Sequence, residues 1–165
     1  MASETTKPEL KGVGGWLTFF IFILGIVSPT RMMLNAAYTI HDVRAAEQIL
    51  GTGTATYITF FWCVVLLSAA VSLTLALLLL GRHRWSTVRI VIGGLWCLAL
   101  LPTAADVIAS MILFPGIATE GMSEILFSVG KSAISATLWT CYLLMSKRVA
   151  NTYLKDVSET ERIFG

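Results

Sequence analysis

The chain has 165 residues, of which 56% are hydrophobic and 13% are charged, with a formal net charge of +2. A soluble domain usually has about 25% charged residues, so this composition excludes a fold whose surface is covered by water. The long apolar runs do not alternate as the strands of a membrane barrel do. We therefore predict an all-α integral membrane protein that lies in the lipid bilayer. We expect no nucleic acid among its partners.

Four apolar segments are each long enough to cross a bilayer, for which a helix needs about 20 mainly apolar residues. In chain order they cover residues 14–38, 56–80, 88–114 and 125–145. The predicted fold is a four-helix transmembrane bundle within residues 14–146. An N-terminal segment, 1–13, precedes it, and a basic juxtamembrane tail, 147–165, follows it. We expect the first segment to be retained as a helix, because no small-residue cleavage site follows it promptly.

The short connections predict the orientation, because basic residues accumulate in cytoplasmic loops. Most basic residues flank the bundle on one side, namely Lys7, Lys11, Arg82, Arg84, Arg89, Lys147, Arg148, Lys155 and Arg162, against Arg31, Arg44 and Lys131 on the other. Both termini are therefore predicted to be cytoplasmic. On the outer side, residues 41–48 are expected to form a short helix, 51–54 a flexible joint and 115–121 a tight turn.

Basic residues at the cytoplasmic surface can also attract anionic lipids, at about 1 kcal/mol each. The residues placed there by this orientation are Arg82, Arg84, Lys147 and Arg148.

Three of the apolar segments are interrupted by an ionisable residue, namely Arg31, Asp106 and Lys131. Charges inside a membrane span are costly. At a rise of about 1.5 Å per residue, all three are expected to lie within the outer leaflet. Helical spacing extends each charge into a polar stripe, and stripes turned to lipid would be penalised, so we predict that they converge inside the bundle. The stripes are Ser28, Arg31 and Asn35; Thr103, Asp106 and Ser110; and Ser128, Lys131, Ser132 and Ser135.

Two interpretations of this predicted cluster remain open. In the structural one, Asp106 pairs with Arg31, Lys131 extends toward the interface, and the set fixes the packing of the helices. In the functional one, the cluster forms a positively charged, outward-facing pocket for an anionic group. Its side chains would be those of Arg31, Asp106, Lys131, Asn35, Thr103 and Ser135. Nearby prolines, Pro29 and Pro102, would free backbone carbonyls at the same level.

Motifs typical of catalysis are absent: the chain has no G-x-S-x-G, no H-E-x-x-H and no phosphate-binding G-x-x-x-x-G-K-[ST] sequence. The cysteines Cys63, Cys97 and Cys141 fall in different segments and are expected to be small packing residues. We therefore expect no enzymatic activity, no metal site and no cofactor.

Two motifs near the ends of the chain resemble a known family. Gly12-Val13-Gly14-Gly15-Trp16-Leu17 with Ser28-Pro29-Thr30-Arg31, and Trp139, Tyr142, Ser146-Lys147-Arg148-Val149 with Thr152-Tyr153, are similar to the first and last helices of domain of unknown function 2569. This is a bacterial family of small inner-membrane proteins. The resemblance implies a four-helix, multi-pass protein of the bacterial inner membrane and brings no known activity, substrate or cofactor.

Two functions follow from these features. The first is a non-enzymatic accessory or scaffold protein that binds another membrane protein or a second copy of itself, as the small size, the short loops and the absence of catalytic motifs suggest. Ser68 and Ser72 have the spacing that lets helices approach closely, which predicts packing within the bundle and also allows a homodimer. The alternative is a binding protein, or a component of a small transporter, for an anionic ligand or lipid headgroup. In that case the cluster around Arg31, Asp106 and Lys131 would form the site.

Overall fold

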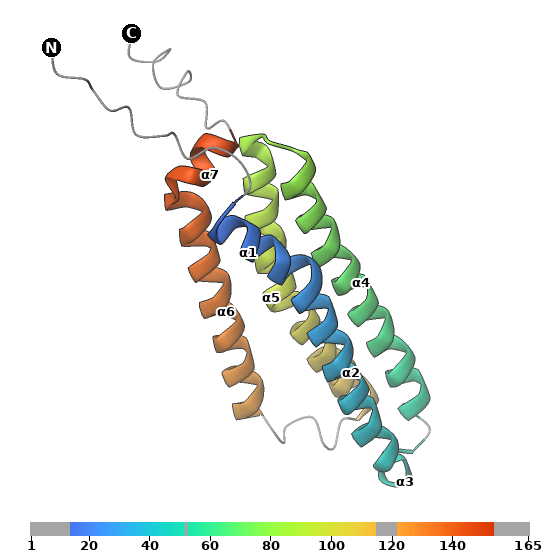
Figure 1. The fold of residues 1–165 in the computed structure, drawn as a ribbon. Helices are drawn as coiled ribbons and strands as arrows, with labels where there is room; N and C mark the ends of the chain where they lie inside the picture. Colours follow the sequence, from blue (N-terminus) through green and yellow to red (C-terminus); the bar gives the residue numbers. More distant parts are fainter. Residues whose placement is uncertain (1–13, 52, 115–121, 154–165) are drawn as a thin grey trace, which may run out of the picture.

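The computed structural model describes residues 14–51, 53–114 and 122–153, and within them all regular secondary structure is helical (Figure 1). Three helical segments, Trp16–Ala45, Gly53–Gly81 and Trp85–Leu113, are long and apolar enough to cross a membrane. The prediction of a helical membrane protein is therefore confirmed. The predicted segment 1–13, the turn 115–121 and the tail beyond residue 153 lie outside the described residues.

The helices run up and down the long axis of the molecule. In chain order they are α1 (Trp16–Phe22), the π-helical η1 (Ile23–Val27), α2 (Ser28–Ala45), α3 (Glu47–Leu50), α4 (Gly53–Gly81), α5 (Trp85–Leu113), α6 (Met122–Met145) and α7 (Lys147–Thr152). The start of α1, the α4–α5 turn and α7 lie at one end of the bundle, here called the α7 end (Figure 1). The short α3 lies at the opposite end, the α3 end.

The helix boundaries differ from the predicted spans at the α3 end. The first helix continues to Ala45 and includes most of the outer helix expected at residues 41–48, because no helix-breaking residue separates them. Gly51, with φ of 73°, then turns the chain into α4. The 24-residue α6 is not among the three most apolar segments, because Lys131 and many hydroxyl side chains dilute its hydropathy. Its crossing of the membrane stays a prediction.

The π-helical segment η1 changes which face of the first helix points into the bundle. One extra residue in a helical turn rotates everything that follows by about 100°. Before η1 the buried residues are Leu17, Phe20 and Ile21, and after it they are Ala36 and Ile40. At this rotation per residue, the two sets fall on one continuous face only when the extra residue is counted. The segment therefore keeps one apolar face on the core along the whole first helix.

Pro29 and Ser72 explain why a π turn is stable at this point. In η1 the Ser28 N–H donates to the Ile23 carbonyl, so the next donor in this register would be the nitrogen of Pro29, which carries no hydrogen. The Leu24 carbonyl instead accepts a hydrogen bond of 2.6 Å from the buried Ser72 hydroxyl of α4. Since a backbone group in a bilayer must find its partner within the protein, this bond ties the first helix to α4.

Small residues let these two helices approach closely. Ser68, Ser72 and Ala76 are buried at four-residue spacing along α4. On the facing helix, a Cβ added to Gly25 would lie 3.1 Å from the Cβ of Ala76. The small-residue face that was predicted around Ser68 and Ser72 thus packs within the chain.

The short helix α7 covers the bundle at its end. The Ser146 side chain caps α7 by accepting a hydrogen bond from the Val149 N–H at 3.4 Å. Just after α7, the buried Tyr153 hydroxyl donates to the Leu79 carbonyl at 2.7 Å. Leu79 lies in the last turn of α4, where carbonyls have no donor within the helix, so Tyr153 completes that helix end. Val149 and Tyr153 belong to the main apolar core, which therefore lies toward the α7 end.

Replacing Ser72 with alanine should lower the free energy of unfolding by about 1–3 kcal/mol, because the Leu24 carbonyl loses its donor. In a Pro29→Ala background, the new N–H at position 29 can serve that carbonyl, so the same replacement should cost less. Denaturant unfolding of the four proteins, analysed as a double-mutant cycle, measures the difference. Ser68→Ala is the matched control, because the Ser68 hydroxyl donates within its own helix, to Val64. Equal costs in both backgrounds would contradict this account.

Tyr153 should make stability depend on alkaline pH. Burial raises the pKa of the Tyr153 hydroxyl to about 12, with a smaller contribution from nearby Tyr142. The neutral form is thus favoured in the folded state, so the stabilisation is complete below the ordinary tyrosine pKa of about 10 and is lost as the pH rises toward 12. Thermal unfolding of the wild type and Tyr153→Phe across this range should show a difference at neutral pH that shrinks as the pH rises. A constant difference would refute the assignment.

Candidate functional site

A cavity of about 490 Å³ lies between α2, α5 and α6. Its polar lining consists of hydroxyl, amide and cationic side chains: Ser28, Arg31 and Asn35 from α2, Thr103 from α5, and Ser128, Lys131, Ser132 and Ser135 from α6. Five of the six residues of the predicted cluster, all except Asp106, therefore line one cavity. We call this space the α2–α5–α6 cavity.

The polar stripe of α2 reaches this cavity because of the π turn. In a regular helix, Ser28, Arg31 and Asn35 would share the face of Leu24 and point toward α4. The rotation of about 100° introduced by η1 turns the stripe instead toward α5 and α6. On α6, Ser128, Lys131, Ser132 and Ser135 share one face at ordinary helical spacing and need no such correction.

Asp106 lies elsewhere, and the predicted pairing with Arg31 is wrong. The Tyr57 hydroxyl of α4 donates a hydrogen bond of 2.6 Å to the Asp106 carboxylate, and within the described chain no ion pair joins Asp106 to Arg31. The reason is angular: three residues beyond Thr103, the helix has turned about 300° and risen about 4.5 Å. Thr103 faces the cavity, while Asp106 faces α4 nearer the α3 end.

Tyr57 is the residue that the sequence analysis missed. Its side chain is 5% exposed and packs between the rings of Phe61 and Phe114, with centroids 5.8 Å and 5.6 Å away. A signal for the pair was available: Tyr57 lies near the beginning of α4 and Asp106 near the end of α5. Antiparallel packing of these two helices brings such positions to the same level.

The separation of Asp106 leaves the cavity positively charged. Arg31 and Lys131 line it, and none of the lining residues in the described chain is acidic. The Lys131 ammonium lies 4.2 Å from the centre of the Phe127 ring, a cation–π contact that holds the side chain on its own helix. Pro102 lacks an N–H and cannot donate to the carbonyl of Leu98, a residue that lines the cavity.

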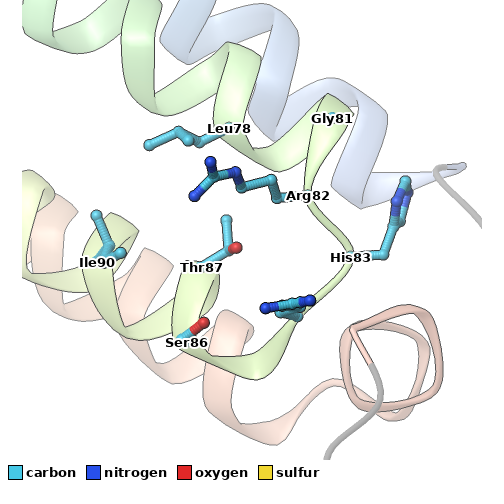
Figure 2. A pocket seen from close by; sticks show the side chains of 8 residues that line it. Leu78, Gly81, Arg82, His83, Ser86, Thr87 and Ile90 are labelled. Atoms are coloured by element: carbon cyan, nitrogen blue, oxygen red, sulfur yellow. The ribbon is translucent and has the colours of Figure 1, made fainter.

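The predicted surface residues gather at the α7 end. Arg82 and Arg84 are exposed on the α4–α5 turn and border a second cavity of about 470 Å³, which Leu78 and Thr87 also line. Figure 2 shows the Arg82 side chain extending between Leu78 and Thr87, whereas His83 lies on the other side of the turn. A role of this turn in attracting anionic lipids stays a prediction.

The two family-like motifs meet at this end as well. A Cβ added to Gly14 or Gly15 would lie within 2.9 Å of the Arg148 guanidinium, so the side chain covers the start of α1. Gly15 also has φ of 58°, which favours glycine. Arg148 is thus half-buried against the first helix, while Lys147 is exposed.

The cysteines and the possible metal ligands of the described residues are dispersed. No group of three or more His, Cys, Asp or Glu side chains there could hold a metal ion. Cys63, Cys97 and Cys141 are free and exposed, so the expectation that they pack inside the bundle is wrong. Their helices present these positions outward because the inward faces carry the small and polar residues described above.

Tyr57→Phe should lower the free energy of unfolding by about 1–3 kcal/mol, because it leaves the Asp106 carboxylate without its donor. Asp106→Asn should cost less, since an amide oxygen can still accept the bond. Thermal unfolding in detergent micelles measures both effects. Tyr38→Phe is the matched control, because Tyr38 is 71% exposed. Wild-type stability of Tyr57→Phe would show that the pair does not support the fold.

Comparison with known proteins identifies a family. No curated protein and no solved structure matches the chain. A family model described as "Protein of unknown function (DUF2569)" matches residues 10–154. This range contains both terminal motifs, the π-helical segment and every residue that lines the α2–α5–α6 cavity. The chain therefore belongs to the DUF2569 family.

Proposed function

We propose that the chain is a four-span protein of the bacterial inner membrane that binds an anionic ligand in the α2–α5–α6 cavity. Three helical segments qualify as spans by length and composition. Two observations support α6 as the fourth span: it has 24 residues, and it packs along α5. The basic residues of the α4–α5 turn and α7 favour a cytoplasmic position for the α7 end.

The charge of the cavity carries the proposal. Arg31 and Lys131 line it without an acidic neighbour among the described lining residues, and hydroxyl groups surround them. Charges interact more strongly in a region of low dielectric constant than in water, so an anion there would gain from both cations. Hydrogen bonds to charged groups contribute about 1.5–3 kcal/mol each. This geometry favours the anionic-ligand alternative over the accessory role that the sequence suggested first.

The position of the cavity also favours binding over catalysis. Its lining offers hydroxyl groups, an amide and two cations, and none of its described residues is a His, Cys, Asp or Glu that could serve as a general base. We therefore propose a non-enzymatic protein, either a binding protein or one component of a small transporter.

Removing either cation tests the proposal. Arg31→Gln and Lys131→Gln should each weaken binding of phosphatidylglycerol or glycerol phosphate about tenfold or more, given the strength of charged hydrogen bonds. Native mass spectrometry of the protein in detergent, with phosphatidylcholine for comparison, measures the retained ligand. Arg44→Gln removes an exposed cation of α2 that does not line the cavity, and this variant should bind as the wild type does.

Asp106→Asn provides a second control, because Asp106 does not line the cavity. It should keep wild-type binding even if its thermal stability falls. Unchanged binding by an Arg31→Gln, Lys131→Gln double variant would sink the proposal. Capture of one specific membrane protein by crosslinking, without a bound anion, would support the accessory role instead.

A further inference from the structure

We infer that the anionic ligand is an amphiphile, whose charged head lies between Arg31 and Lys131 and whose acyl chain lies along the same cavity toward the α7 end. This inference rests on the proposed function and adds the chemical class of the ligand and its route of access. It depends on how polar and apolar residues are distributed along the cavity.

The cavity changes from polar to apolar along the bundle axis. Toward the α3 end its lining is mainly polar, with Asn35 on α2, Thr103 on α5 and Ser128 on α6, and Met32 is the apolar residue there. Toward the α7 end it is apolar, with Ile23, Leu24, Leu95, Leu98, Ala136 and Trp139. The two cations lie in the polar part. A ligand that fits this pattern has one anionic end and one apolar end.

The lining is also too long for a small anion. On η1 and α2 together it runs over residues 23–35, and on α6 over residues 128–139. At 1.5 Å per residue these stretches correspond to roughly 16–18 Å. A phosphate group would occupy only the polar part, and the apolar remainder would gain nothing from it. An acyl chain would fill that part and make van der Waals contacts along it that a small anion cannot make.

An aromatic pair closes the cavity at its apolar end. The rings of Phe20 and Trp139 are 4.5 Å apart, and Trp139 is itself a lining residue. Phe20 is buried in the main core. Because this floor separates the cavity from the α7 end, we infer that the ligand does not pass through it.

The open side of the cavity lies between α2 and α6. α2 packs along α4 and α6 packs along α5, and Figure 1 shows α6 apart from α2. Lining residues at this side, including Arg31, Asn35, Lys131 and Ser135, are exposed at the surface of the described chain. This level lies within the predicted spans, so the opening faces the bilayer rather than water. A membrane lipid can therefore reach it by lateral diffusion.

Charge complementarity favours a lipid over a second copy of the chain. Polar side chains that face acyl chains are costly, so something polar should cover them. A symmetric dimer through this face would place Arg31 and Lys131 against the same two cations of the partner. An anionic headgroup instead neutralises them, and its own acyl chain covers the apolar part.

Filling the apolar part tests this inference separately from the proposed function. Ala99 lines the cavity on α5, so Ala99→Phe should weaken phosphatidylglycerol binding at least tenfold and leave glycerol phosphate binding unchanged. Ala104→Phe is the matched control, because Ala104 is exposed on the same helix and does not line the cavity. Native mass spectrometry with both probes gives the comparison, after thermal unfolding has shown that each variant is folded.

A second measurement needs no variant. For the wild type, monoacyl phosphatidylglycerols of increasing chain length should bind more tightly with each added methylene until the cavity is full. Arg31→Gln should weaken the whole series.

Equal binding of all chain lengths, or wild-type lipid binding by Ala99→Phe, would overturn the amphiphile and leave a headgroup or soluble-anion site. Lipid binding that survives Arg31→Gln and Lys131→Gln would overturn the proposed function itself.

Discussion

The hydrogen bond from the Ser72 hydroxyl to the Leu24 carbonyl stabilises the π turn on which the arrangement of the bundle depends. Without it, a backbone carbonyl in an apolar environment would have no donor, since the following Pro29 cannot supply one. With it, the π turn can hold one extra residue, which rotates the rest of the first helix. The apolar face of this helix therefore stays on α4 on both sides of the turn. The polar stripe that contains Arg31 is rotated away from the core as a result. One proline and one serine on different helices thus create the polar wall of the cavity.

A similar angular effect on α5 separates the charges. Thr103 and Asp106 differ by about 60° around the helix, which is enough for one to face the cavity and the other to face Tyr57 on α4. If Asp106 had faced the cavity, it would have neutralised Arg31 and left a structural ion pair. Because it does not, the cavity keeps two cations. The same three ionisable residues therefore have different consequences depending on helix rotation alone.

The two ends of the bundle are built differently. At the α7 end, Tyr153 completes the end of α4, Arg148 covers the glycines at the start of α1, and the buried core is continuous. These contacts join the first and last helices, and they involve the residues of the two terminal motifs. Beyond that end, α6 is held mainly by α5, and the space beside α2 remains a cavity. A rigid end and a more open middle suit a protein that admits a ligand from the side.

The amino-acid sequence by itself determined the membrane environment, the helical segments, the family and the polar stripes of α2 and α6. These depend on composition and on spacing along a single helix, where 3.6 residues per turn is enough to assign a face. Only the tertiary structure decided that Asp106 pairs with Tyr57, that the cysteines face outward and that the first helix contains a π turn. Each of these depends on the rotation of one helix against another. That rotation comes from contacts between distant residues, such as Ser72 with Leu24, which no pattern within one segment contains.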